Sequence, residues 1–260
     1  MKTVILCGGY GTRIRDVSDD LPKPMIPIGN YPILWHIMKY YSTFGHKDFI
    51  LCLGYKSEVI KDFFVNYEVR ANDFTITLGS DDSVNFNRKH GEEGWKITMA
   101  ETGINAMTGA RVKRIQNYIG NDQHFMLTYG DGVGDVDLEK LIAFHLSHGK
   151  IATLTGVRPP GRFGELEYDQ QNRVLGFNEK PQTSAGRISG GFFICNRDIF
   201  KYLNDDESLV LEQEPMKALV QVGQLMVYKH DGFWQPMDTS REFNLLNKLY
   251  ENKQAPWVKW

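Results

Sequence analysis

A glycine-rich segment near the N-terminus has the residue types for holding phosphate groups. Residues 4–6 form an uncharged apolar run that predicts a buried strand. Glycine lets the main chain approach a ligand closely, so that N–H groups can converge on an anion, and a guanidinium suits phosphate oxygens. The strand end and the segment after it comprise Leu6, Cys7, Gly8, Gly9, Tyr10, Gly11, Thr12 and Arg13.

A second cation, Lys23, lies between Pro22 and Pro24. Proline fixes its own φ and restricts the residue before it, so this lysine has an unusually constrained backbone. A glycine-rich segment that follows a strand is, by itself, as often a tight turn as a phosphate-binding loop. The added lysine favours a site for a triphosphate. The dinucleotide fingerprint is excluded because the run from Gly9 ends in Ile14, and no glycine has the P-loop spacing to a lysine.

Two aspartates, Asp131 and Asp238, are candidate metal ligands. Asp131 lies between Gly130 and Gly132, and Asp238 immediately precedes a predicted helix. Taken singly, each carboxylate is more typical of a turn or a helix cap. As a pair at one sheet edge they would suit Mg²⁺, which takes few protein oxygens and completes its shell with phosphate and water.

The segments 6–13 and 22–25 together resemble the signature of the sugar-1-phosphate nucleotidylyltransferases. The similarity extends over nearly the whole chain. It is also carried by residues 32–38, 107–109, 129–132, 159–164 and 232–239. Within the family the similarity is greatest to members that use CTP and glucose 1-phosphate. The resemblance therefore implies transfer of CMP from CTP to glucose 1-phosphate, giving CDP-glucose and pyrophosphate for deoxysugar and lipopolysaccharide O-antigen synthesis.

The resemblance also implies roles for individual residues. Arg13 and Lys23 are the expected catalytic residues, and Asp131 and Asp238 the expected Mg²⁺ ligands. Lys180, Ser189 and Gly190 are expected to bind the sugar phosphate. The expected nucleotide-binding residues are Leu6, Cys7, Gly8, Gly9, Tyr10, Gly11, Thr12, Arg13, Lys23, Ala106, Arg111 and Gly130.

Three positions depart from the family pattern. Relatives carry asparagine where Ser189 stands, and Ala106 and Ala110 replace small polar or glycine residues. These departures leave the acceptor open, and the choice of CTP over UTP or dTTP rests on resemblance. Two alternatives remain: transfer to another phosphorylated acceptor, or a non-catalytic nucleotide sensor. Retention of both lysines and both aspartates favours an enzyme.

Composition limits the remaining possibilities. A chain of 260 residues with 42% apolar content suits one α/β domain. A net charge of −2 gives no overall attraction to nucleic acid or anionic membranes. Cys7, Cys52 and Cys195 each lie in apolar runs, which predicts buried thiols. No apolar run has membrane-spanning length and there is no signal-peptide pattern, so we expect a cytoplasmic protein. We also expect it to form homo-oligomers.

The order of elements predicts an α/β fold with a single Rossmann-like, mixed and mainly parallel sheet flanked by helices, plus a smaller antiparallel region. Such sheets bind ligands beyond the carboxyl ends of their strands. The domain is expected to span 1–260, with a nucleotide-binding half of about 1–135 and a sugar-phosphate-binding half of about 136–260. Residues 74–78 and 95–99 alternate in the manner of antiparallel strands, and both are predicted to be such strands. The polar insert at 80–94 is either a flap or an oligomer contact.

Local signals predict helix boundaries and two side-chain clusters. Ser57 and Asp137 are expected to cap helices, residues 110–119 to form a helix, and Thr239 to begin a capping box. His145 and His148 have i, i+3 spacing, but no third ligand lies nearby and a metal site is not favoured there. A core or subunit-contact role is expected for the aromatic residues Phe233, Trp234, Trp257 and Trp260.

Overall fold

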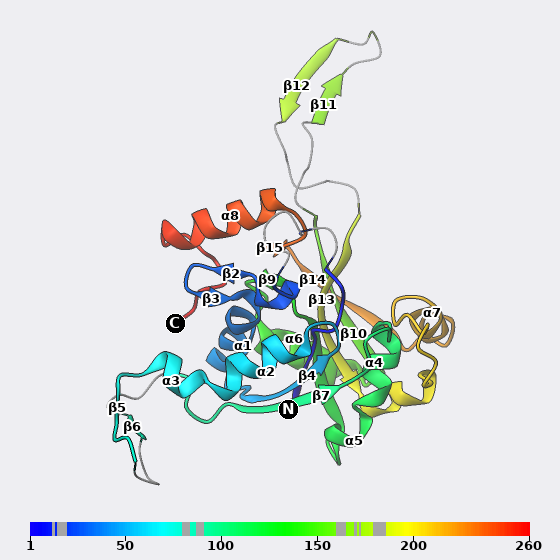
Figure 1. Cartoon of the computed structure of the whole chain (residues 1–260). Helices are drawn as coiled ribbons and strands as arrows, with labels where there is room; N and C mark the ends of the chain where they lie inside the picture. The colour runs from blue at the N-terminus through cyan, green and yellow to red at the C-terminus, as the bar shows by residue number, and fades with distance from the viewer. Residues whose placement is uncertain are drawn as a thin grey trace.

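Seven strands form a central mixed sheet in the order β14-β10-β13-β8-β1-β4-β7 (Figure 1). The computed structural model describes residues 1–11, 14, 20–79, 84–86, 91–159, 165–168, 171, 173–178 and 186–260. All strands of this sheet run in the same direction except β13, which is antiparallel to both of its neighbours. The strands are β1 (Thr3–Leu6), β4 (Asp48–Leu53), β7 (Lys96–Glu101), β8 (His124–Tyr129), β10 (Ala152–Val157), β13 (Ile188–Asn196) and β14 (Leu225–His230).

Helices cover both faces of the sheet, because both faces of its central strands are apolar. Ile5 of β1 belongs to one buried cluster, while Val4 and Leu6 belong to the cluster on the opposite face. The first cluster includes residues of α1, α6 and α8, and the second includes residues of α4, α5 and α7. The helices are α1 (Ile33–Thr43), α2 (Ser57–Val65), α3 (Tyr67–Ala71), α4 (Thr108–Arg114), α5 (Gln116–Ile119), α6 (Leu138–His148), α7 (Glu214–Gln221) and α8 (Ser240–Glu251).

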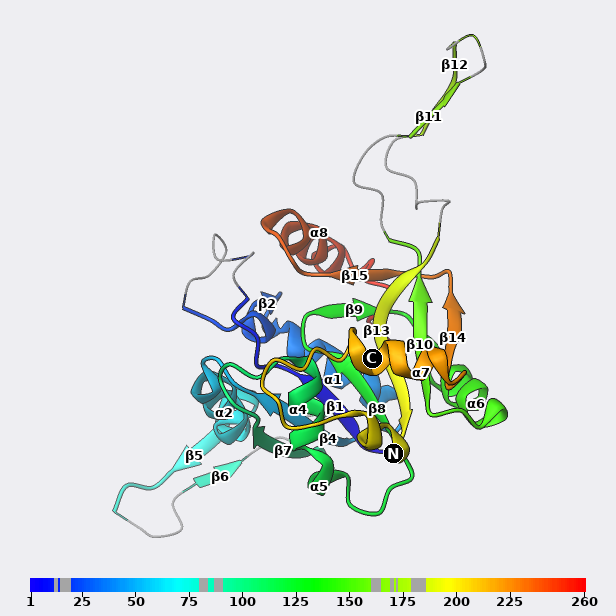
Figure 2. The same cartoon turned by 90° about the vertical axis from the view of Figure 1, so that its right-hand side faces the viewer.

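Four short antiparallel pairs are added to this framework, so the predicted α/β fold with a smaller antiparallel region is confirmed. The pair β9–β15 lies beside the carboxyl edge of the main sheet, whereas β5–β6 and β11–β12 project from the body (Figures 1 and 2). The pairs are β2 (Pro27–Ile28) with β3 (Tyr31–Pro32), β5 (Phe74–Ile76) with β6 (Val84–Phe86), β9 (Gly132–Gly134) with β15 (Trp234–Pro236), and β11 (Glu165–Tyr168) with β12 (Val174–Asn178).

Three local predictions are wrong. The strand expected at 95–99 is β7, which pairs in parallel with β4, and the antiparallel partner of β5 is β6. The helix expected at 110–119 is divided at Ile115. Ser57 is the first residue of α2 and not its cap, which is Lys56 in a left-handed conformation. The alternation at 95–99 correctly indicated a strand, but alternation carries no information about the direction of its partner.

Other local predictions are confirmed. The Asp137 carboxylate accepts a hydrogen bond from the backbone N–H of Lys140 and caps α6. Thr239 and Glu242 form the capping box of α8. The three cysteines are buried and free. Burial raises the pKa of the Cys52 and Cys195 thiols to about 12, so these two groups remain protonated at neutral pH.

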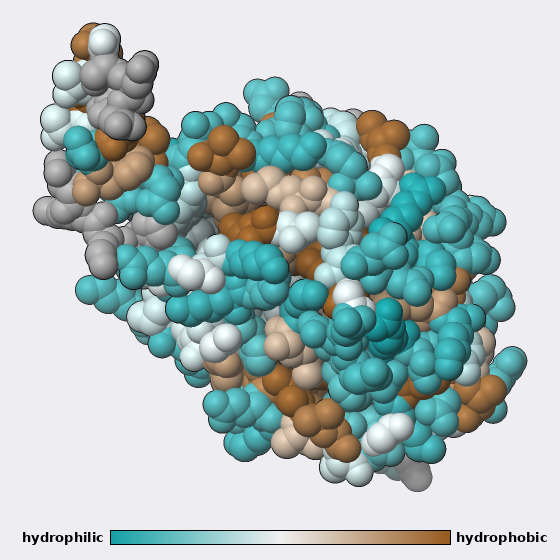
Figure 3. Space-filling model, turned by 90° about the horizontal axis from the view of Figure 1, so that it is seen from below, coloured by the Kyte–Doolittle hydropathy of each residue, from teal (hydrophilic) through white to brown (hydrophobic). Residues whose placement is uncertain are grey.

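The surface is mainly hydrophilic on the face in Figure 3, with small separate apolar patches. Apolar side chains are exposed on the β5–β6 hairpin, where the rings of Phe74 and Phe86 face each other across the two strands. Part of the 80–94 insert lies outside the described residues, so the choice between a flap and an oligomer contact stays open. Among the described helices, none has both the length and the apolar character needed to cross a membrane.

Three histidines form a hydrogen-bonded chain at the amino edge of the sheet. The backbone N–H of Lys150 donates to His148 Nδ1, which leaves the proton of the neutral ring on Nε2 to donate to Thr153 Oγ1. The Thr153 hydroxyl can then donate to His145 Nδ1, and His145 Nε2–H to His124 Nδ1. All four of these hydrogen bonds can form when the three rings are neutral. Burial, with the neighbouring His124 and His148, lowers the pKa of His145 to about 4.

Candidate active site

A cleft of about 520 Å³ opens at the carboxyl edge of the sheet, where the fold predicts a ligand site. Loops that follow β1, β7, β8 and β15 contribute to its walls. The lining residues are Leu6, Cys7, Gly8, Gly9, Tyr10, Gly11, Lys23, Pro24, Ile104, Asn105, Ala106, Met107, Thr108, Arg111, Tyr129, Gly130, Asp131 and Asp238. The cleft thus brings together the described members of the predicted nucleotide and metal sets.

The three glycines of the loop after β1 differ in their surroundings. Gly8 and Gly11 pack closely against other described residues of the protein, whereas Gly9 does not. A Cβ added to Gly8 would lie 2.1 Å from Nη1 of Arg111. Gly11 has a φ of +61°, and an added Cβ would lie 3.0 Å from Cβ of Lys23. Among the described residues, no atom lies within 4 Å of a Cβ added to Gly9. Gly9 is therefore the position at which the main chain is free to lie against a ligand.

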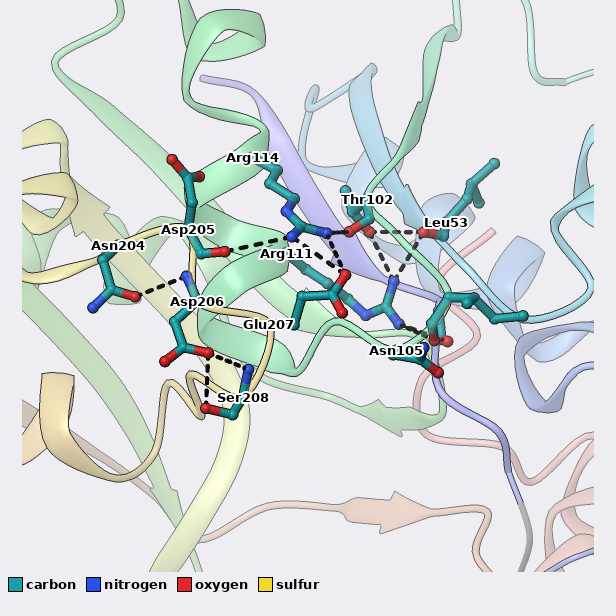
Figure 4. A network of polar contacts seen from close by, with 12 residues as sticks. Leu53, Thr102, Asn105, Arg111, Arg114, Asn204, Asp205, Asp206, Glu207 and Ser208 are labelled. Atoms are coloured by element: carbon teal, nitrogen blue, oxygen red, sulfur yellow. Dashed lines mark hydrogen bonds and ion pairs between the residues drawn. The ribbon is translucent and has the colours of Figure 1, made fainter.

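Arg111 fixes the loops around the cleft. Its guanidinium donates to the carbonyl oxygens of Leu53 and Gly8, each at 2.9 Å, and of Ile104 at 3.3 Å, and to Thr102 Oγ1 at 2.8 Å (Figure 4). The side chain is buried, and burial lowers its pKa from the ordinary arginine value. These bonds tie the ends of β1 and β4 to the loop after β7. Direct contact of Arg111 with a nucleotide stays a prediction.

The Lys23 ammonium lies between the two carboxylates at the base of the cleft. Its Nζ is 2.5 Å from Asp131 Oδ2 and 2.5 Å from Asp238 Oδ1. Burial alone lowers the pKa of Lys23, but the charge and hydrogen bond of Asp131, followed by those of Asp238, outweigh it and raise the pKa. The lysine therefore remains charged at neutral pH.

Short segments far apart in the sequence hold the two carboxylates together. Pairing of β15 with β9 places Pro236 opposite Gly132, and the Met237 N–H donates to the Asp131 carbonyl at 2.8 Å. The Glu242 carboxylate accepts from the backbone N–H groups of Asp238 and Thr239. The helix cap and the strand pair thus fix the backbone of both aspartates.

The donor set suits a divalent cation of the magnesium type. Asp131 and Asp238 already converge on one cationic centre, the Lys23 ammonium. Within the described ranges, no group of three or more His, Cys, Asp or Glu side chains is placed to hold a metal ion. An ion bound here would take two protein carboxylates and fill its other positions with substrate and water oxygens, which is typical of Mg²⁺ sites.

Of the three predicted acceptor-binding residues, Ser189 and Gly190 lie within the described part of the chain. Ser189 and Gly190 lie at the start of β13, at the same sheet edge, but they do not line the cleft. Ser189 is exposed and paired in register with Gly156 of β10. Thr12, Arg13 and Lys180 lie outside the described residues. Their predicted roles, like those of the placed residues, stay predictions.

Sequence reasoning missed several contacts around the cleft. Tyr10 donates from its hydroxyl to Asn105 Oδ1 at 2.9 Å, joining two of the lining loops. The Glu212 carboxylate accepts hydrogen bonds from the hydroxyls of Tyr129 and Thr108. Burial and the nearby Glu212 charge raise the pKa of Tyr129, which keeps its proton available for this bond. No local motif signals these pairs, because their members are 83 to 104 residues apart.

The comparison with family models gives a match over residues 2–244 to the model described as nucleotidyl transferase. The chain belongs to this family. This nucleotidyl transferase is 47% identical over 260 residues to "Glucose-1-phosphate cytidylyltransferase" of Salmonella typhi, covering 100% of each chain. It is 43% identical over 261 residues to "Probable glucose-1-phosphate cytidylyltransferase" of Bacillus subtilis, again over 100% of each chain.

Solved structures of the same fold include the protein described as HddC from Yersinia pseudotuberculosis, with a TM-score of 0.69. That match covers 96% of this chain and 99% of the other at 22% identity, so it supports the fold alone. The family-model match and the two full-length relatives confirm the family membership expected from the N-terminal motifs.

Proposed function

We propose that this nucleotidyl transferase is a glucose-1-phosphate cytidylyltransferase, which transfers CMP from CTP to glucose 1-phosphate and releases pyrophosphate. The substrate assignment is supported by full-length identities of 47% and 43% to relatives of that name. The observation that carries the chemistry is the Lys23 ammonium between Asp131 and Asp238 at the base of the cleft.

The proposed reaction is an in-line displacement. An oxygen of the sugar phosphate forms a bond to the α-phosphorus of CTP, and the bond to the bridging oxygen of pyrophosphate breaks. A phosphate monoester is largely dianionic near neutral pH, so no residue has to remove a proton. The main barrier is the approach of one anion to another, which positioned cations and N–H donors reduce.

We propose that different residues hold different groups of the two substrates. Lys23 has a raised pKa and is proposed to contact the α-phosphate and the incoming oxygen as a charged donor. The open main chain at Gly9, with Arg13, is proposed to hold the β- and γ-phosphates. Lys180, with Ser189 and Gly190, is proposed to hold the acceptor. Asp131 and Asp238 would hold Mg²⁺, which when bound neutralises and orients phosphate oxygens.

We further propose that the domain has two functional halves. The nucleotide-binding half spans about 1–135, and the sugar-phosphate-binding half about 136–260. The protein is proposed to work as a cytoplasmic homo-oligomer that supplies CDP-glucose for deoxysugar and surface-polysaccharide synthesis.

The test is pyrophosphate release with Mg²⁺ from a panel of four nucleoside triphosphates and several sugar 1-phosphates. We expect the highest kcat/KM for CTP with glucose 1-phosphate. Lys23→Ala should abolish most turnover. Lys61→Ala, which removes a surface lysine paired with Glu101 outside the cleft, should not. A higher kcat/KM with another pair would replace the assigned substrates. CTP binding without pyrophosphate release from any pair would indicate the nucleotide sensor instead.

A further inference from the structure

The start of β13 contains a bulge at the predicted acceptor segment. In its pairing with β10, Leu154 lies opposite Phe193 and Gly156 lies opposite Ser189. Two steps along β10 therefore correspond to four steps along β13, so the bulged strand carries two extra residues between these pairs. A bulge interrupts the ladder of hydrogen bonds and re-aims the backbone, and such bulges are common next to active sites.

The two glycines of this bulge are enclosed by neighbouring side chains. A Cβ added to Gly190 would lie 2.5 Å from Cγ1 of Val157. Gly191 has a φ of +74°, and an added Cβ would lie 2.4 Å from Cδ2 of Tyr129. Both positions therefore require glycine, and the bulge has little freedom on these two sides.

Trp234 satisfies a carbonyl of the bulge. Its indole Nε1–H donates to the carbonyl oxygen of Gly190 at 2.7 Å. Trp234 belongs to β15, four residues before Asp238, and β15 pairs with β9 immediately after Asp131. The same short strand thus carries the indole that holds the bulge and leads directly into one of the two carboxylates.

We infer that Trp234 is a positioning residue for the acceptor, which fixes the Gly190 peptide so that Ser189 and the bulge present one geometry to the sugar phosphate. This inference rests on the proposed function. The peptide group between Gly190 and Gly191 is planar, so holding the Gly190 carbonyl also fixes the N–H of Gly191. Trp234 does not line the nucleotide cleft, so its loss should affect the acceptor and not CTP.

Trp234→Phe keeps an aromatic ring and removes the donor, which makes it the appropriate test. Loss of one neutral hydrogen bond should raise the KM for glucose 1-phosphate by about five- to tenfold. The KM for CTP should stay within about twofold, as expected for two separately held substrates. Discrimination between glucose 1-phosphate and its epimers should narrow, because the bulge would no longer be held in one orientation.

Trp35→Phe is the matched control. The Trp35 indole donates to the Tyr67 hydroxyl at 2.8 Å, away from the cleft, so this variant loses a similar bond. It should lower the melting temperature and leave both KM values unchanged. An unchanged acceptor KM in Trp234→Phe, or an equal rise in both KM values, would overturn the inference. If the wild-type protein forms no CDP-glucose, the proposed function is wrong, independently of the role of Trp234. The KM comparison of Trp234→Phe with Trp35→Phe is then made with the acceptor that the substrate panel identifies.

Discussion

Gly8→Ala should destabilise the protein because of a single neighbour, Arg111. The new Cβ would lie 2.1 Å from Nη1, 2.3 Å from Cζ and 2.8 Å from Nη2 of that guanidinium. The guanidinium cannot withdraw freely, because its donors bind three carbonyl oxygens and the Thr102 hydroxyl. Overpacking costs about 1–3 kcal/mol, and each lost hydrogen bond to a charged group about 1.5–3 kcal/mol. We expect a loss of about 3–5 kcal/mol, or roughly 10 °C in melting temperature.

Gly9→Ala is the adjacent control. No atom of the described part of the chain lies within 4 Å of its added Cβ, so the melting temperature of the ligand-free protein should be unchanged or slightly higher. If the main chain at Gly9 lies against the triphosphate, the same variant should raise the KM for CTP. Calorimetric unfolding without ligand, and initial rates with CTP varied, separate the two effects. Equal melting temperatures for the two variants would refute the argument that Arg111 requires glycine at position 8.

The remaining predictions concern charge. Asp131→Asn and Asp238→Asn should abolish turnover with little change in far-UV circular dichroism, and normal rates at limiting Mg²⁺ would contradict a two-carboxylate metal site. Lys23→Ala should act mainly on kcat and Arg13→Ala mainly on the KM for CTP, since only the first meets the centre where charge changes; steady-state kinetics with purely KM effects for both would exclude this division. The pKa of His145 is lowered to about 4, below the unfolded value of about 6.5, so the unfolded chain takes up the proton first as pH falls. The contribution of His145 to stability should thus be constant well above pH 6.5 and decline by about 1–3 kcal/mol towards pH 4, and urea unfolding that is the same at pH 7.5 and 5 would contradict this.

Much of the fold could be predicted because local sequence reports burial well. The uncharged run at residues 4–6, predicted to be a buried strand, lies in β1, whose residues are all buried. Gly45 has a φ of +82° just beyond α1, as expected of a glycine that follows a helix. The strand β8 has a similar local signal, because its largely apolar run stops immediately before Gly130 and Asp131.

The sequence predicts which residues belong to the site, but not which of them contact one another. Proline-flanked Lys23 and glycine-flanked Asp131 stand out locally, whereas their ion pair joins residues 108 positions apart. The reversal of β13 and the two residues of its bulge depend on which strands become neighbours, and alternation does not encode this. Trp234 packs against the core, as expected. Its hydrogen bond to Gly190 could not be predicted, because no sequence signal connects an indole with a carbonyl 44 residues away.

The reversed direction of β13 also affects how the protein can be re-engineered. Val157 and Ile188 are paired neighbours, so the chain leaves the sheet after β10 and returns to it at an adjacent position. The intervening residues 158–187 include the projecting β11–β12 hairpin (Figure 2) and Lys180. A segment whose two ends already meet can be exchanged as a cassette, because its length adds little to the entropy of closing the loop. Transplanting this cassette between relatives should therefore exchange the segment that carries Lys180, while Ser189, Gly190 and the nucleotide cleft, which lie outside it, are retained.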